Sequence, residues 1–364
     1  MQAPHETPEA DAAAWHRRRA RTIASSDRAF IRGLHTRRMS SLLAIVGLVL
    51  AQLTIASVCA RLALGWVVVL SATVGAFCAW GLHSFMHDVT HRSVALTDKP
   101  RVQAVLLRLC ALTYPDLALY LYYRWHHLAH HRQLGHHGVQ EVVFGHDHDV
   151  DVLAVSAYYR ARRTHDSRPS SATPALFRST PAKLLVGLLP LVDYILTSLL
   201  FTRHGLSFLA TRLRSGANLT PRRLHAKRSA LVHLLVVIGF QAGIWALFGW
   251  QAFVYLLLSL LFVKGLAFHP YLLFWLTIHK TTHHPDQCQP TTSTYGPLTT
   301  RLFWGLSNHV EHHDFPGVPS PDLAKLRLRF PDDYERLFAF ASLADAYRQF
   351  FAADTAWVYG CQDS

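Results

Sequence analysis

Apolar residues occur in long uninterrupted blocks along this chain, and polar residues fill the stretches between them. Residues 41–60 contain no charged side chain, and residues 62–82 repeat the pattern after the single Arg61. Each block holds about 20 residues, which lets a helix cross a hydrocarbon core of ~30 Å. The two blocks therefore predict a transmembrane hairpin.

A second pair of apolar blocks lies at residues 230–249 and 252–278 and predicts a second transmembrane hairpin. Lys264 falls near the middle of the last block, where a buried cation is costly. We expect this lysine to face a polar tunnel, to pair with Asp116 or Asp193, or to lie at a shifted helix end from which its ammonium group reaches water.

Two further apolar stretches contain residues that a membrane span rarely carries. Residues 104–122 are interrupted by an arginine, a proline and an aspartate, and residues 184–201 by Pro190 and Asp193. We expect partly buried or interfacial helices here rather than spans. The fold class is therefore predicted to be an all-α integral membrane protein, with four transmembrane helices in two hairpins and interfacial helices between them.

The charge distribution gives the expected sidedness. The chain carries 36 Lys and Arg against 23 Asp and Glu, a formal charge of +13. Its polar, basic N-terminal segment, residues 1–40, is too long before the first apolar run for a secretory signal. Because positive flanks tend to stay in the cytosol, we place this segment there, with residues 1–12 as a solvated tail.

Each hairpin then returns the chain to the cytosol. The loop of residues 83–229 and the C-terminal part of residues 279–364 are expected to share that side, within one domain of residues 41–364. Charge that flanks membrane spans also accounts for the basic composition, so nucleic-acid binding is not predicted.

The chain has 25 histidines, and eight of them fall into three boxes with helical spacing. These are His87 and His91, then His127, His130 and His131, and finally His309, His312 and His313. Offsets of three and four residues share one helix face, so the rings of a box can converge on a single point. Imidazole favours iron, copper, zinc or nickel over magnesium. Eight rings exceed the roughly four to six ligands of one metal ion, which predicts a binuclear centre in a histidine-rich cytosolic cap.

Other residues near the boxes leave alternatives open. His83 lies one turn before the first box and is expected to be packed or to support a ligand, and His126 replaces His127 if the second box is HxxxHH. Three carboxylates adjoin ligands and either accept a ring N–H from one or are surface charges: Asp88, Glu311 and Asp314. Four more histidines are expected to be solvated loop residues: His136, His137, His146 and His148.

Several other classes of site are not predicted. The five cysteines lack CxxC spacing, so neither a disulfide framework nor an iron–sulfur site is indicated. No glycine-rich phosphate loop or dinucleotide fingerprint occurs, so the chain is not expected to carry its own flavin or nicotinamide. A metal transporter or sensor would place histidines along a path inside the spans, whereas most of these lie outside the apolar blocks.

The boxes and hairpins together resemble the membrane fatty acid desaturase superfamily, and several stretches look closest to its sphingolipid Δ4-desaturase (dihydroceramide desaturase) branch. Residues 309–316, HVEHHDFP, resemble the HNEHHDFP segment of that branch. Residues 130–139, with HHRQLG followed by Gly-Val, resemble its HHRYLGxxGV segment. Tyr295-Gly296-Pro297 precedes the third box as it does there. The similarity covers residues 80–145 and 255–340.

The resemblance implies a centre of two iron ions, held by the eight box histidines and by one further histidine ten residues after a His-Pro pair. His269-Pro270 indicates His279 at that offset, with His283 one turn later as its competitor. No catalytic residue beyond these ligands is expected. The implied activity is an O2-dependent oxidoreductase that takes two external electrons and introduces a double bond into a lipid acyl or sphingoid chain.

No fused cytochrome b5 or ferredoxin pattern is present, so we expect a separate donor of either type to dock at the basic cytosolic face. The same scaffold also fits a lipid hydroxylase or a carotenoid ketolase or hydroxylase. The acyl substrate stays open, because the N-terminal segment typical of the sphingolipid branch is not recognisable before residue 41. An Ala- and Arg-rich composition, without an ER-retrieval tail, favours a bacterial inner membrane over the ER.

Overall fold

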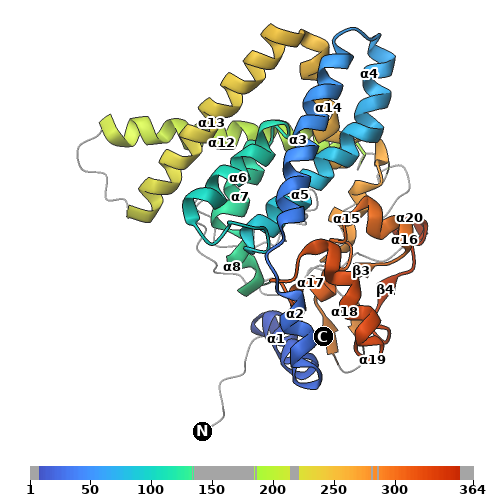
Figure 1. Cartoon of the computed structure of the whole chain (residues 1–364). Helices are drawn as coiled ribbons and strands as arrows, with labels where there is room; N and C mark the ends of the chain where they lie inside the picture. Colours follow the sequence, from blue (N-terminus) through green and yellow to red (C-terminus); the bar gives the residue numbers. More distant parts are fainter. Residues whose placement is uncertain are drawn as a thin grey trace, which may run out of the picture.

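The computed structural model describes residues 8–132, 134, 184, 187–213, 221–279, 282–284 and 287–352. Within these ranges the protein is mainly helical, and three helices are long and apolar enough to cross a membrane. Figure 1 shows the long helices in the upper part of the molecule and the shorter C-terminal elements below them. Residues at the lower end of the long helices therefore meet the C-terminal part, and this junction carries the site described below.

The first hairpin consists of α3, Met39–Cys59, and a continuous helix of 27 residues, Leu64–Thr90. The continuous helix comprises α4, Leu64–Leu70, a π-helical stretch, Ser71–Gly75, and α5, Ala76–Thr90. We expected the second span to end near residue 82, but the helix continues through the first histidine box. Its apolar pattern gives way to polar residues that are themselves buried, so the hydropathy change does not mark the helix end.

The second hairpin begins with α13, Pro221–Phe248, of which Leu224–Phe248 can span a membrane. The next helix, α14, runs only from Trp250 to Val263, so the expected single helix over residues 252–278 is wrong. Gly265 has φ of 100° and Ala267 has φ of 52°, which breaks the chain into a 3-10 turn before α15, Tyr271–Thr277. The fourth long span predicted from hydropathy is thus a short helix, a turn and a second short helix.

The break in the last apolar block is accompanied by a buried ion pair. Lys264 caps the C-terminus of α14, and its Nζ lies 2.8 Å from Oδ2 of Asp116. Both side chains are largely buried, with 14% and 4% of their surface exposed. Pairing with Asp116, one of the expected alternatives for Lys264, is confirmed.

The interrupted apolar stretches form helices that are not among the three candidate spans. Residues 104–122 fall in two helices separated at Pro115, which are α6, Pro100–Leu112, and α7, Leu117–Trp125. A third helix, α8, His127–Arg132, follows directly. The other stretch lies in α12, Leu189–Leu213, which runs across the bundle rather than along α3 and α5 (Figure 1).

The C-terminal part combines short helices with four short strands, so the expectation of an all-α protein needs correction. Strand β1, Thr282–His284, pairs antiparallel with β2, Gln287–Gln289, and β3, Ser293–Thr294, pairs parallel with β4, Ala339–Phe340. The helices are α16, Pro297–Leu302, α17, His309–Asp314, α18, Leu323–Arg329, α19, Pro331–Tyr334, and α20, Leu343–Ala352, with a 3-10 turn at Ser320–Asp322.

The basic N-terminal segment is folded onto this C-terminal part. Helix α1, Pro8–Ser26, and helix α2, Arg28–Leu34, lie beneath α17 and α18 in Figure 1. Their buried apolar residues share one cluster with those of α17–α19: Trp15, Ile23, Ile31, Leu34, Val310, Phe315, Val318, Leu323, Leu326, Phe330 and Tyr334. The solvated tail that we expected over residues 1–12 is wrong from Pro8 onward, because helix α1 begins there.

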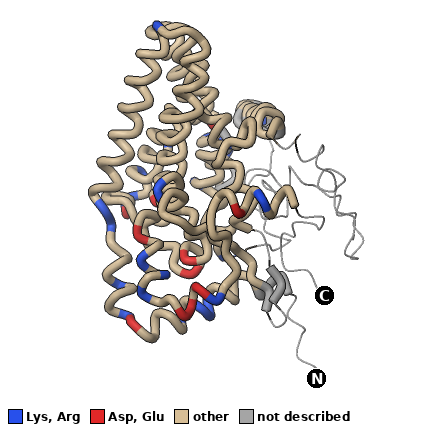
Figure 2. Tube along the Cα trace, turned by 90° about the vertical axis from the view of Figure 1, so that its right-hand side faces the viewer, with Lys and Arg blue, Asp and Glu red and all other residues tan. Residues whose placement is uncertain are grey.

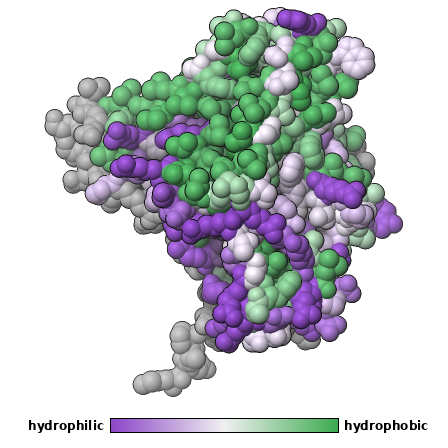
Figure 3. Space-filling view, viewed as in Figure 1, coloured by the Kyte–Doolittle hydropathy of each residue, from purple (hydrophilic) through white to green (hydrophobic). Residues whose placement is uncertain are grey.

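The surface divides into an apolar upper part and a polar lower part. Figure 3 shows hydrophobic residues over the long helices and hydrophilic residues over the lower end, and Figure 2 places most of the charged residues in the lower half. Large apolar side chains are exposed on α3, α4 and α13, including Leu43, Leu50, Trp66, Leu235 and Trp245. Such a band on a soluble protein would be a severe aggregation liability, so these helices face lipid.

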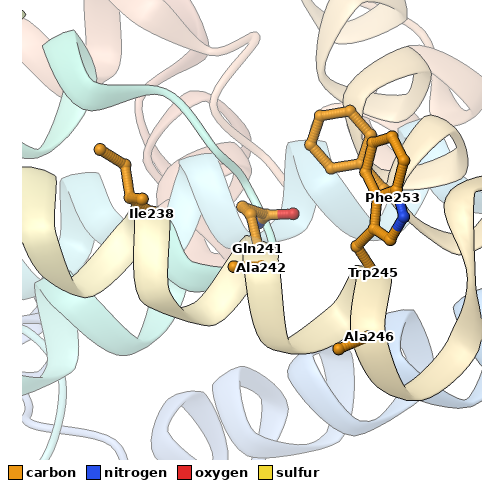
Figure 4. Close-up of a pocket in the computed structure, with 6 residues that line it drawn as sticks. All are labelled: Ile238, Gln241, Ala242, Trp245, Ala246 and Phe253. Atoms are coloured by element: carbon orange, nitrogen blue, oxygen red, sulfur yellow. The ribbon is translucent and has the colours of Figure 1, made fainter.

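A shallow depression indents this apolar wall. Five of its lining residues come from α13 and the sixth, Phe253, from α14 (Figure 4). Trp245 and Phe253 lie with their rings 5.6 Å apart at one end of it. Its lining is almost wholly apolar and the long helices around it are exposed, so we regard it as part of the lipid-facing surface.

Candidate metal centre

Five histidines from three separate helices form a first group. His87 lies in the last turn of α5, His91 caps that helix, His127 and His131 lie in α8, and His312 lies in α17. One ring nitrogen from each lies within 4.8 Å of the others. The shortest separations are 2.7 Å between Nε2 of His87 and His312, and 2.9 Å both between Nε2 of His91 and His127 and between Nε2 of His312 and His131.

A second group lies beside the first. Ring nitrogens of His130, His279 and His313 lie within 4.8 Å of one another. Nε2 of His309 is 3.1 Å from Nε2 of His313 and 3.4 Å from Nε2 of His279, so His309 also belongs to the second group. The structure therefore brings all nine histidines predicted as ligands together, in two adjacent sets.

Each three-histidine box is divided between the two groups. In α17, His309 and His313 face the second group, whereas His312 faces the first. Helix α8 divides in the same way, with its i and i+4 rings in the first group and its i+3 ring in the second. Positions i+3 and i+4 are rotated by about 60° and 40° in opposite senses from position i, which points their rings apart. Our expectation that a box converges on one point is thus wrong for the two three-histidine boxes, which each bridge two points, whereas both rings of the first box, His87 and His91, lie in the first group.

The electrostatics of the cluster suit transition-metal ions. Burial lowers the pKa of the α8 and α17 rings well below 6.5, and repulsion between neighbouring rings lowers it further, for His127, His131, His309, His312 and His313. The rings are therefore neutral at pH 7, with nitrogen lone pairs able to bind a cation. Nine imidazoles fit two ions such as iron, and supply no hard oxygen ligands for magnesium.

Two side chains hydrogen-bond to the outer nitrogens of ligand candidates. Asp88 lies 3.2 Å from Nδ1 of His87 and also accepts hydrogen bonds from the backbone N–H and the hydroxyl of Ser320. The hydroxyl of Tyr122 lies 2.7 Å from Nδ1 of His127. Such contacts fix ring orientation and tautomer. Tyr122 was not a sequence candidate, because only the turn between α7 and α8 brings it back onto the second box.

The other two carboxylates that adjoin ligands make contacts elsewhere. Glu311 accepts hydrogen bonds from the hydroxyls of Ser293, at 2.7 Å, and Tyr295, at 2.8 Å. Burial raises its pKa. Asp314 lies 2.7 Å from Nδ1 of His16, a residue that the sequence did not single out. Both carboxylates are buried rather than surface charges, and they tie α17 to neighbouring elements.

The remaining histidine candidates fall outside the two groups. His83 is buried, its ring stacks on Trp80 and its Nε2 lies 3.1 Å from the hydroxyl of Tyr123, so it packs above the cluster. His126 is buried beside the second box without joining either group. His283 has its backbone in β1, and its side chain lies outside the described part of the chain. The same holds for the whole of His136, His137, His146 and His148.

Replacement of Tyr122 tests the outer contact of His127. Nε2 of His127 faces the first group, so Nδ1 carries the proton and donates it to the tyrosine oxygen. Tyr122→Phe removes that acceptor and so loses the contact that orients the ring of His127. We expect the metal affinity to fall by roughly 10–100-fold, measured by competition with a chelator. Tyr123→Phe is the matched control, because its hydroxyl contacts His83, and equal affinities for both variants would contradict the prediction.

A buried cluster of nine histidines at the polar end of an apolar helical bundle defines a multi-pass membrane protein with a histidine-rich site suited to metal ions. The particular family follows from the sequence comparison. The profile described as "Fatty acid desaturase" matches residues 64–341, about three quarters of the chain, so this protein belongs to the fatty acid desaturase family. It is an oxidoreductase of lipid metabolism.

The similar curated proteins come from the sphingolipid branch. The chain is 30% identical to the sphingolipid delta(4)-desaturase/C4-monooxygenase DES2 of Bos taurus over 301 residues, which cover 80% of this chain and 75% of that protein. It is 26% identical to the sphingolipid delta(4)-desaturase DES1 of Xenopus tropicalis over 298 residues, 81% of this chain and 75% of that protein. The resemblance seen in the motifs is thereby confirmed. No solved structure gives a significant match to the chain.

Proposed function

We propose that this protein is a di-iron, O2-dependent lipid desaturase whose metal ligands are the nine clustered histidines. The observation that carries the proposal is the arrangement of these rings in two adjacent groups, with the i and i+4 rings of one box facing one group and the i+3 ring facing the other. Two helices that each contribute to both groups fix the distance between two metal ions. A binuclear centre needs a fixed distance between its two metal ions, and a histidine tract on the surface does not supply one.

The chain's own residues have separate tasks in this proposal. The first group and the second group would each hold one iron ion, and bound iron would supply the dioxygen chemistry needed to oxidise an unactivated C–H bond. Asp88 and Tyr122 orient His87 and His127 through their outer nitrogens. Seven of the nine rings are buried and His91 and His131 are half-buried, which limits the access of water and so limits side reactions at the site.

The substrate that we propose is a lipid with a long acyl or sphingoid chain. Support comes from the similar proteins, whose names specify sphingolipid Δ4-desaturation and, in DES2, C4-monooxygenation. Hydroxylation is the second candidate activity, because the name of DES2 includes a monooxygenase. Both reactions begin with the oxidation of an unactivated C–H bond. A carotenoid substrate has no support from these relatives.

We further propose that the cluster faces the cytosol and receives electrons from a separate acidic donor, of the ferredoxin or cytochrome b5 type. Five arginines of α1 and α2 are exposed at the polar end, near the histidine groups: Arg17, Arg18, Arg21, Arg28 and Arg32. Positive charge there attracts an acidic partner and speeds its association, and high salt screens this attraction and slows the association. The relatives named above are eukaryotic, so a bacterial inner membrane rests on composition alone and stays a prediction.

The lipids of an expressing host test the proposed activity. The chain is expressed in a host that lacks such enzymes but makes sphingolipids, and extracted lipids are compared by mass spectrometry with those of a host that carries an empty vector. We expect a new species that is lighter by two hydrogens. A species heavier by one oxygen identifies the hydroxylase instead, and an unchanged lipid profile in the presence of a functional donor would count against both.

A further inference from the structure

Helix α1 covers the side of the metal centre that lies away from the membrane helices. Its polar sequence would suit a solvated helix, yet Trp15 and His16 are buried, with 7% and 4% of their surface exposed. The neighbouring Arg17 and Arg18 are exposed. One face of α1 therefore packs against α17, and His16 lies on that face.

The two ring nitrogens of His16 are both engaged by residues close to the second histidine group. Nδ1 lies 2.7 Å from Oδ1 of Asp314, and Nε2 lies 3.0 Å from the hydroxyl of Thr291. Since the carboxylate can only accept, Nδ1 carries the proton and Nε2 accepts from the threonine. Arg19, one turn further along α1, donates from Nε to Oδ2 of Asp314 at 3.2 Å.

The ring of His16 also lies against a proposed metal ligand. Its centroid is 5.1 Å from that of His313, with the ring planes 34° apart. Asp314, which His16 holds, is the next residue in the chain after His313. His16 thus restrains His313 both through ring contact and through the backbone of α17, while neither of its own nitrogens is available for a metal ion.

We propose that His16 is a positioning residue, which closes the second histidine group against water and holds His313 in the orientation for metal binding. The inference rests on the proposed metal centre and adds the N-terminal helix to it. The geometry assigns no comparable contact from α1 to the first group among the described residues, so loss of His16 affects one metal ion and spares the other. Release of that ion becomes faster because His313 gains both water access and freedom to rotate.

Metal release from the purified full-length protein tests this inference without measuring turnover. The iron-loaded protein is mixed with a chelator, and release is followed by absorbance. In His16→Gly, we expect half of the iron to leave roughly 10–100-fold faster than in the native chain, the range found when an outer contact of a ligand is lost. The other half is expected to leave at the native rate. Added imidazole, which fits the space left by the side chain, is expected to restore slow release.

Arg17→Gly is the matched control, because it places the same helix-weakening residue at the exposed neighbouring position. We expect this variant to release both ions at the native rate. The inference is overturned if His16→Gly keeps native release of all its iron, or if Arg17→Gly loses half of its iron as readily. If the native chain itself fails to bind two ions, the proposed metal centre fails, which is a separate result.

Discussion

His312→Ala is expected to abolish lipid oxidation, with a loss of more than ~100-fold, beyond the 10–100-fold typical of outer contacts. His312 is the member of the first group that comes from α17, and the other four come from α5 and α8. Its Nε2 lies 2.7 Å from Nε2 of His87 and 2.9 Å from Nε2 of His131. Removal of this one ring takes away the contribution of α17 to the first group, so the ion there would keep ligands from α5 and α8 only. Product formation in membranes and the iron content of the purified variant both measure the effect.

The matched control for this variant is His225→Ala. His225 is exposed on α13 and belongs to neither histidine group, so its loss removes an imidazole without touching the centre. We expect native activity and native iron content for this control. An active His312→Ala variant with a full complement of iron would show that His312 is not a ligand.

Lys264→Met is expected to destabilise the folded protein by about 3–5 kcal/mol, because it removes the cation that lies 2.8 Å from the buried Asp116 carboxylate. The pair links the end of α14 to the start of α7, where Asp116 also accepts a hydrogen bond from the backbone N–H of Leu119 at 3.1 Å. Attraction at 2.8 Å offsets the cost of burying both charges, and the variant loses that attraction while the carboxylate stays buried. Thermal unfolding in detergent, followed by circular dichroism, measures the loss.

A double variant separates the ion pair from side-chain packing. Asp116→Asn keeps an N-cap for α7 and removes the charge, so Lys264→Met combined with Asp116→Asn is expected to recover most of the lost stability. Additive losses in the double variant would show that the two residues do not stabilise the fold as a pair.

The sequence predicts the membrane helices well where a long apolar run coincides with one helix. Residues 41–60, 62–82 and 230–249 match the three candidate spans to within one or two residues at the ends that they overrun, because each crossing needs a continuous apolar surface. The mean hydropathy of the last block does not locate its break, although Lys264 and Pro270 lie on either side of it. Gly265 and Ala267 adopt positive φ there, and hydropathy contains no information on backbone conformation.

The histidine boxes predict which rings come together but not how the rings are divided between the two groups. Spacing identifies a helix face, and this is enough to gather residues of α5, α8 and α17. The split within the second and third boxes depends on how α8 and α17 are rotated against each other, which is set by packing between segments far apart in sequence. His16 was missed for the same reason, since 298 residues separate it from Asp314, its partner.

The metal content of the purified full-length protein is the most direct test of the central claim, that widely separated histidines form one binuclear centre. Protein reconstituted with ferrous iron under anaerobic conditions is desalted and its iron measured per chain, with X-ray absorption to detect a second metal near the first. The account predicts two iron ions per chain, bound by nitrogen ligands and close to each other. A single ion per chain, or two ions without a neighbouring metal, would contradict it.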